Sequence, residues 1–138
     1  MSQYNAILLL GSNIGDRKKN IFTALGFLEN RVGKVLQKSE ILETEPVEFC
    51  SSNYFFNFAL LINTALSPIQ LLKAIKKIES EMGRKADTSA IGYFTDRIID
   101  IDIVRYSGIM FKCEKLEIPH LKHLKEREFS KKILENLK

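Results

Sequence analysis

Two aspartates, Asp100 and Asp102, alternate with isoleucines over residues 99–103. Side chains alternate across a strand, so both carboxylates should point to one face, with their α-carbons about 6.6 Å apart. Two carboxylates at that separation can hold a pair of divalent ions ~3.5–4 Å apart, as phosphoryl-transfer sites require. Ligands that are all oxygen favour Mg²⁺ over Zn²⁺. The alternative is a solvated acidic edge strand, but the apolar neighbours indicate a strand that is buried on one face and central in the sheet.

Cationic residues lie close to this pair in the sequence. Arg97 comes three residues before Asp100, and Arg84 with Lys85 begins the preceding loop. Cations beside a metal–carboxylate pair can bind the oxygens of a triphosphate, although such loop charges are about as often merely solvated. The glycine-containing segment 11–15 matches neither a Walker loop nor a dinucleotide fingerprint. We interpret that segment as a tight turn from a strand into a helix.

Three further residues have the chemistry to bind a flat heterocycle. Phe55 and Phe129 could stack on its two faces. The amide of Asn57 could both donate to and accept from its edge. Either phenylalanine taken alone is more typical of a hydrophobic core. His120 and His123 lack the spacing of metal ligands but could contact phosphate.

Apolar patterns predict the elements that position these residues. The predicted elements follow one another as strand, helix, two strands, helix and strand, which is the ferredoxin-like split βαβ pattern of the α+β class. We expect a mainly antiparallel sheet with both helices packed on one face. The predicted strands cover 5–10, 34–43, 54–64 and 97–106, the helices cover 16–31 and 67–82, Gly33 is a helix C-cap, and Ser107-Gly108 turns into an added strand at 109–112.

The composition is that of an ordinary globular chain. Its 138 residues are 45% hydrophobic and 28% charged, so we predict a single domain over 1–138. No apolar run reaches the ~18 residues of a membrane span, and no signal peptide is recognisable. Two cysteines without a CxxC motif indicate a reducing cytoplasm. The net charge of +4 suggests an anionic partner, whether nucleic acid, nucleotide or phosphorylated metabolite.

Taken in order, these segments resemble one family, the 6-hydroxymethyl-7,8-dihydropterin pyrophosphokinases. The resemblance spans nearly the whole chain, and the combination is far more specific than any one piece. The chain departs from the family pattern in lacking a Trp in the loop after Arg84 and in ending soon after Phe129. The matching stretches are LGSN at 10–13, ETEP at 43–46, FFN at 55–57, IE at 78–79, MGR at 82–84, DRIIDIDI at 96–103, IPH at 118–120 and EREF at 126–129.

The resemblance implies transfer of pyrophosphate from ATP to the hydroxymethyl group of the reduced pterin, with release of AMP. It also implies two Mg²⁺ ions on Asp100 and Asp102, which bridge the ATP phosphates. We expect small-molecule substrates only, no nucleic acid, no membrane, and a monomer. On the nucleotide side the resemblance places Arg84, Arg97 and His120 at the phosphates, Glu79, Ile103 and Lys115 near the nucleotide, and Arg127 near the catalytic loops. On the pterin side it places Phe55 and Phe129 on the two ring faces, and Asn57 with the backbone of Thr44 and Val47 at the ring edge.

Two alternatives stay open. A basic ferredoxin-like domain that binds nucleic acid would fit the charge and the aromatic run at 54–58, although that run lacks the glycines and leading cation of an RNA-binding motif. A homologue that binds pterin and nucleotide without activity would fit the short C-terminus.

Overall fold

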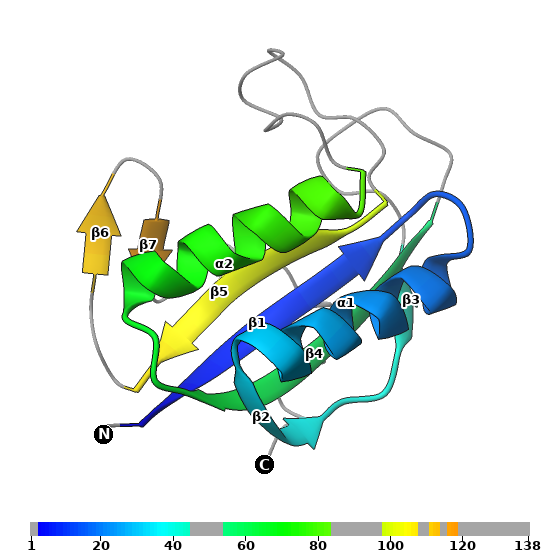
Figure 1. Ribbon diagram of the computed structural model, residues 1–138. Coiled ribbons are helices and arrows are strands. Elements are labelled where there is room, and N and C mark those ends of the chain that lie inside the picture. The colour runs from blue at the N-terminus through cyan, green and yellow to red at the C-terminus, as the bar shows by residue number, and fades with distance from the viewer. Residues whose placement is uncertain (1–2, 45–53, 84–97, 108–110, 114–115, 119–138) are drawn as a thin grey trace.

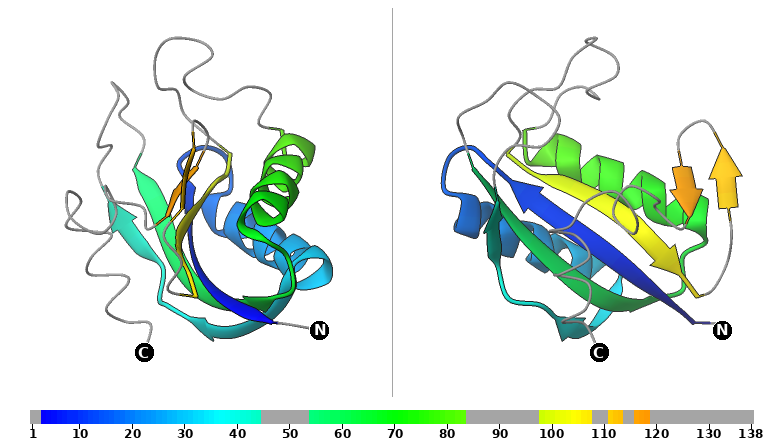
Figure 2. Two further views of the ribbon diagram at one scale, coloured as in Figure 1. Left: turned by 90° about the vertical axis from the view of Figure 1, so that its left-hand side faces the viewer. Right: turned by 180° about the vertical axis from the view of Figure 1, so that it is seen from behind.

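The computed structural model describes residues 3–44, 54–83, 98–107, 111–113 and 116–118. Its main sheet has the order β2-β4-β1-β5, with the short β3 beside β4 and every pairing antiparallel. This is the split βαβ arrangement, and both helices cover the same face of the sheet (Figures 1 and 2). The predicted fold class is therefore confirmed. The strands are β1 (Tyr4–Ser12), β2 (Gly33–Lys38), β3 (Leu42–Thr44), β4 (Phe55–Thr64) and β5 (Asp100–Tyr106), and the helices are α1 (Arg17–Arg31) and α2 (Pro68–Glu81).

Capping residues set where the two helices begin and end. Asp16 caps α1 and accepts a hydrogen bond from the Lys19 amide at 3.1 Å. Ser67 and Gln70 form a reciprocal capping box at the start of α2, and Gly83 follows α2 with a φ of +108°, a conformation that favours glycine. In the ranges that the structure describes, neither helix is long and apolar enough to span a membrane.

The hydrophobic core lies between the sheet and the two helices. Alternate residues of β5 point into it, so Ile101 and Ile103 are buried there together with Ile99. A smaller cluster of Leu9, Ala59 and Val104 is buried on the opposite face of the sheet. The two faces of β5 therefore differ: isoleucines face the helices, and the aspartates face the other way.

The single strand predicted over 34–43 is wrong, because the chain forms β2 and β3 with a break between them. At the break, the Ser39 amide donates to the Ala59 carbonyl at 2.9 Å, and the Ser39 hydroxyl accepts from the Ala59 amide at 2.9 Å. The hydroxyl thus replaces a backbone acceptor, a local competition that serine side chains commonly enter. The pairing with β4 resumes at Leu42.

The role predicted for Gly33 is also wrong. Val32 is the C-cap of α1, and Gly33 begins β2 without a positive φ. A Cβ placed on Gly33 would lie 1.8 Å from the carbonyl oxygen of Asn63. The glycine is required here because two backbones approach too closely for any side chain.

The predicted hairpin at Ser107-Gly108 is a third correction. Ser107 has a φ of 41°, its amide donates to the Asn5 carbonyl at 2.7 Å, and its hydroxyl accepts from the Asn5 amide at 2.8 Å. These bonds tie the end of β5 to β1, and the next strand, β6 (Phe111–Cys113), pairs with β7 (Leu116–Ile118) instead of with β5. The β6–β7 hairpin lies beside α2 and β5 (Figure 1), where Leu116 and Ile118 join the main core.

Candidate active site

Residues far apart in the sequence meet at one end of the sheet. In the strand register, Gly11 of β1 lies opposite Asn57 of β4 on one side and Asp100 of β5 on the other. The end of β1, the start of β5 and the C-terminal end of α2 come together at this place (Figure 1). The row from Asn57 through Gly11 to Asp100 is the frame of the candidate site.

Asp100 and Asp102 point to the face of the sheet away from the helices, as their alternation with buried isoleucines predicted. Both are half-buried, and Asp102 lies opposite Leu9 in the register. Within the described ranges, no three His, Cys, Asp or Glu side chains group together. Two carboxylates with oxygen donors only do not make a structural zinc site. They fit Mg²⁺, which keeps several water ligands and takes others from substrate phosphates.

Glu79 is the buried charged residue of α2, with a side chain that is 3% exposed. Its Oε2 accepts a hydrogen bond from the Ile101 amide at 2.8 Å, and the Nζ of Lys76 lies 3.6 Å from its Oε1. The Ile101 amide lies between the two aspartates on β5. Among the strands that the structure describes, β5 is an edge strand, so the prediction of a central strand is wrong. Glu79 therefore supplies an acceptor that none of the described strands provides to this amide. This contact holds the backbone of β5 where the aspartates project.

The predicted pterin residues converge on the same face. The Nδ2 of Asn57 donates to the Thr44 hydroxyl at 2.6 Å and lies 3.4 Å from the Leu42 carbonyl oxygen. A Cβ placed on Gly11 would lie 3.4 Å from both the Asn57 Oδ1 and the Phe55 Cδ1. Thr44, Phe55 and Asn57 thus border the space above Gly11, and Thr44 engages the donor end of the Asn57 amide.

Ile103, predicted to lie near the nucleotide, does not present its side chain to the candidate site. Its side chain is buried in the core between β5 and the helices. Any contact of this residue with a nucleotide would therefore use its main chain. The predicted site residues that lie outside the described ranges are Val47, Arg84, Arg97, Lys115, His120, Arg127 and Phe129.

Residues 11–15 have more structure than the tight turn predicted from the sequence. Gly11 and Ser12 belong to β1, and both Ser12 and Asn13 are buried despite being polar. The Nδ2 of Asn20 donates to the Ser12 hydroxyl at 3.2 Å and to the Ile14 carbonyl at 3.0 Å. Asn20, on the first turns of α1, therefore holds this segment against the helix. Ser12 and Asn13, two polar residues at the end of an apolar run, were the sequence signal that could have indicated this ordered segment.

The aromatic run of β4 does not form a surface for stacking bases. Phe56 and Phe58 pack toward the core under the helices, and Phe55 is the one of the three that borders Gly11. Single-stranded RNA is typically bound by two or three aromatic side chains on one open sheet face. The arrangement of these three residues does not support the nucleic-acid alternative.

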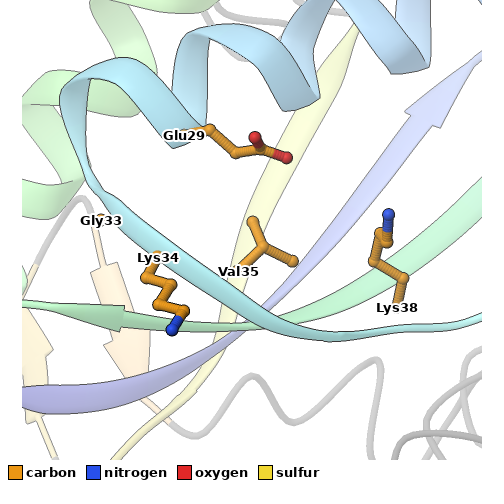
Figure 3. Close-up of a pocket in the computed structure, with 5 residues that line it drawn as sticks. All are labelled: Glu29, Gly33, Lys34, Val35 and Lys38. Carbon is orange, nitrogen blue, oxygen red and sulfur yellow. The ribbon is translucent and has the colours of Figure 1, made fainter.

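A separate pocket lies between the end of α1 and β2 (Figure 3). Because β4 and β1 stand between β2 and β5 in the sheet, this pocket is not part of the candidate site. Its two lysines point to different sides in the close-up: Lys34 points away from Glu29, whereas Lys38, like Val35, points to the opposite side of the strand. The pocket is lined by Glu29, Gly33, Lys34, Val35 and Lys38.

Known proteins resemble this chain along nearly all of its length. The family model of 7,8-dihydro-6-hydroxymethylpterin-pyrophosphokinase (HPPK) matches residues 7–138. The folic acid synthesis protein fol1 of Schizosaccharomyces pombe is 46% identical over 125 residues, which are 90% of this chain and 16% of that protein. The 2-amino-4-hydroxy-6-hydroxymethyldihydropteridine pyrophosphokinase of Porphyromonas gingivalis is 40% identical over 114 residues, 82% of this chain and 77% of that enzyme. The chain thus spans a small part of the fol1 relative and most of the bacterial one.

Solved structures show the same fold. The wild-type HPPK-DHPS of Plasmodium falciparum, crystallised with SDX-DHP, matches 99% of this chain and 41% of its own with a TM-score of 0.76 at 18% identity. At 18% identity this likeness shows the fold alone. The family match and the relatives that are 34–46% identical show the family of the chain. The chain belongs to the 7,8-dihydro-6-hydroxymethylpterin-pyrophosphokinase family, a family of folate-synthesis enzymes, as its motifs predicted.

Proposed function

We propose that this chain transfers pyrophosphate from ATP to the hydroxymethyl group of 6-hydroxymethyl-7,8-dihydropterin and releases AMP. One observation carries the proposal: the half-buried Asp100 and Asp102 share a sheet face and a sheet end with Phe55, Asn57 and Thr44. Carboxylates that could hold a metal ion and residues that could bind a flat ring thus lie next to one another. Membership of the pyrophosphokinase family supports the same reaction.

Asn57 and Phe55 would bind and orient the pterin. Phe55 offers a ring face, and Asn57 offers its amide, held by Thr44, to the edge of the heterocycle. Asn57 and Asp100 are each one strand away from Gly11, so about 9.6 Å separates them at a strand spacing of ~4.8 Å. A substituted bicyclic ring can span that distance. It would then lie over Gly11 with its hydroxymethyl group toward the aspartates.

Asp100 and Asp102 are the residues that would hold Mg²⁺, two ions by the family resemblance. Mg²⁺ held there would supply positive charge to offset that of the ATP phosphates. Glu79 would keep both aspartates in place through the Ile101 amide. Arg84, Arg97 and His120 stay predicted phosphate contacts, and Lys115, Arg127 and the main chain of Ile103 stay predicted neighbours of the nucleotide.

Positioning is the main task in such a reaction, because phosphoryl transfer needs alignment and charge neutralisation more than covalent help from the protein. The pterin hydroxyl oxygen forms a bond to the β-phosphorus while the bond from that phosphorus to the oxygen bridging to the α-phosphate breaks. AMP leaves with that oxygen, and the hydroxyl proton is lost. Asp102 is one candidate acceptor for the proton.

We also propose that residues 1–138 act as one domain and as a monomer in the cytoplasm, with ATP and the reduced pterin as the partners. The absence of a CxxC motif from the sequence supports the reducing compartment. Light scattering at micromolar protein should give the mass of a single chain, and a stable dimer would contradict the proposed monomer.

The direct test combines the protein with ATP, Mg²⁺ and 6-hydroxymethyl-7,8-dihydropterin and identifies the nucleotide product. We expect AMP; formation of ADP would contradict the proposal.

Asp100→Asn should lower kcat by about 10³-fold or more, because it removes a metal-binding charge where electrostatic stabilisation dominates. Its far-ultraviolet circular dichroism should be unchanged. Glu40→Gln, at an exposed position away from the aspartates, is the matched control and should keep full activity. Binding of both substrates without AMP formation would identify a binding-only homologue.

A further inference from the structure

Arg17, the first residue of α1, makes three contacts with the strands beside it. Its Nη1 donates a hydrogen bond to the Tyr54 carbonyl at 2.8 Å. Its guanidinium carbon lies 4.1 Å from the centre of the Phe56 ring, within the range of a cation–π interaction. Its Nη2 lies 3.6 Å from the Glu43 carboxylate. No motif of the sequence pointed to this residue.

The groups that Arg17 contacts alternate with the groups that border the pterin site. In the register of β3 and β4, Glu43 lies opposite Phe56, and the pairs on either side are Thr44 with Phe55 and Leu42 with Asn57. Phe56 packs toward the helices, whereas Phe55 and Asn57 face Gly11 on the other side. Arg17 therefore holds from behind the same short stretch of strand that presents the pterin residues in front.

The hydrogen bond to the Tyr54 carbonyl and the contact with the Phe56 ring should hold the strand more strongly than the ion pair with Glu43 does. The side chain of Glu43 is 52% exposed and that of Arg17 is 29% exposed, and ion pairs between exposed groups contribute little because water screens them. The bond to Tyr54 and the stacking on Phe56 use the planar guanidinium in two directions at once. A lysine ammonium keeps the charge but cannot reproduce both contacts.

We propose that Arg17 is a positioning residue for the pterin. It does not touch the substrate; it fixes the Tyr54 carbonyl and the Phe56 ring, and through them the positions of Phe55 and Asn57. This inference rests on the proposed function, since it assigns Phe55 and Asn57 to the pterin. It predicts that the loss of Arg17 affects the binding of pterin and not that of ATP.

Arg31, at the other end of α1, provides a matched control. Its guanidinium carbon lies 4.5 Å from the centre of the Phe27 ring, and its Nη2 donates to the Glu81 Oε1 at 3.0 Å. It therefore makes the same kinds of contact as Arg17, about 21 Å farther along the helix axis at 1.5 Å per residue. Arg31→Gln should cost comparable stability without touching β3 or β4.

The experiment compares Arg17→Gln, Arg17→Lys and Arg31→Gln by steady-state kinetics and thermal unfolding. We expect Arg17→Gln to raise the pterin KM about fivefold to tenfold, because the hydrogen bond and the cation–π contact that hold Phe55 and Asn57 in position are lost. The ATP KM should stay within about twofold, and Arg17→Lys should recover only part of the pterin affinity. Arg31→Gln should lower Tm without changing either KM.

Two results would overturn the inference: an unchanged pterin KM in both Arg17 variants, or an equal rise of both KM values that follows Tm. Pterin binding by fluorescence, with Mg²⁺ and a non-hydrolysable ATP analogue, separates the two levels of the argument. If the unaltered protein binds no pterin, the proposed function fails. If it binds pterin and Arg17→Gln binds equally well, only the role of Arg17 fails. Should Arg17→Gln not fold, Arg17→Lys gives the same comparison.

Discussion

In the proposed site, Gly11 would determine how much room a pterin has between Asn57 and Asp100. A Cβ at this position would be in ordinary contact with Phe55 and Asn57 at 3.4 Å, so the strand itself can accept a side chain. The two further methyl groups of valine would extend into the space that borders the pterin residues. We expect Gly11→Val to raise the pterin KM about tenfold or more, an effect of one or two misplaced methyl groups. Steady-state kinetics with pterin varied at saturating ATP measures it.

Thermal unfolding provides the control for this substitution. Valine favours strands, so Tm should change by only a few degrees, and Gly11→Ala should give a smaller rise in KM than Gly11→Val. A Gly11→Val protein that binds pterin as tightly as the unaltered protein would show that the ring does not lie over Gly11.

Single residues differ in how well the sequence predicts them. The shared face of Asp100 and Asp102 was predictable because the two-residue period of a strand fixes it locally. The position of Glu79 was not, because its acceptor role depends on the Ile101 amide, 22 residues farther along the chain. The sequence also does not show which of Phe55 and Phe56 faces the candidate site, because only the packing of the helices distinguishes the two faces of β4.

At the level of elements, the pair Arg31–Glu81 joins α1 to α2 and should make stability depend on pH. Hydrogen bonds from Arg31 lower the pKa of Glu81 below its ordinary value of 4.5. Because the folded-state pKa is the lower one, the carboxylate stabilises the fold above pH 4.5 and loses this effect as pH falls through the folded value. We expect the Tm difference between the unaltered protein and Glu81→Gln to shrink over that range.

Salt provides a second measurement on the same pair. Both groups are exposed, so about 1 M NaCl should reduce the Tm difference at neutral pH. Glu40→Gln, which removes an exposed carboxylate on a loop outside this pair, is the matched control for the measurement in salt. A Tm difference that stays constant from pH 7 to pH 3 would mean that the pair does not join the helices in solution.

The helices and the long strands were predictable, whereas the short strands were not. Capping residues such as Ser67 and Asp16 act within one turn, so their effect can be seen in the sequence. The break between β2 and β3 depends on a bond between Ser39 and Ala59, and the end of β5 depends on bonds between Ser107 and Asn5. Both are tertiary contacts between distant residues, and no local pattern predicts them.

The whole molecule separates what holds the fold from what performs the proposed reaction. The main core lies between the sheet and the helices, and the aspartates lie on the other face at one end of the sheet. Among the residues that the structure describes, the largest fully buried side chains are apolar apart from Tyr106, so this part of the core needs no bound ion. Metal removal should therefore abolish activity and leave the fold intact.

Chelation of Mg²⁺ tests this separation. Without substrates, EDTA should leave Tm unchanged, because the apolar core does not bind the ion. ATP at about 100 times its Kd should stabilise the protein by about 2.7 kcal/mol when Mg²⁺ is present, and EDTA should abolish that rise in Tm together with AMP formation. Asp100→Asn should lose the ATP-dependent rise even with Mg²⁺, whereas Glu40→Gln should keep it. An equal rise with ATP in EDTA would place the phosphates away from the aspartates, and unfolding by EDTA alone would reveal an ion that holds the fold itself.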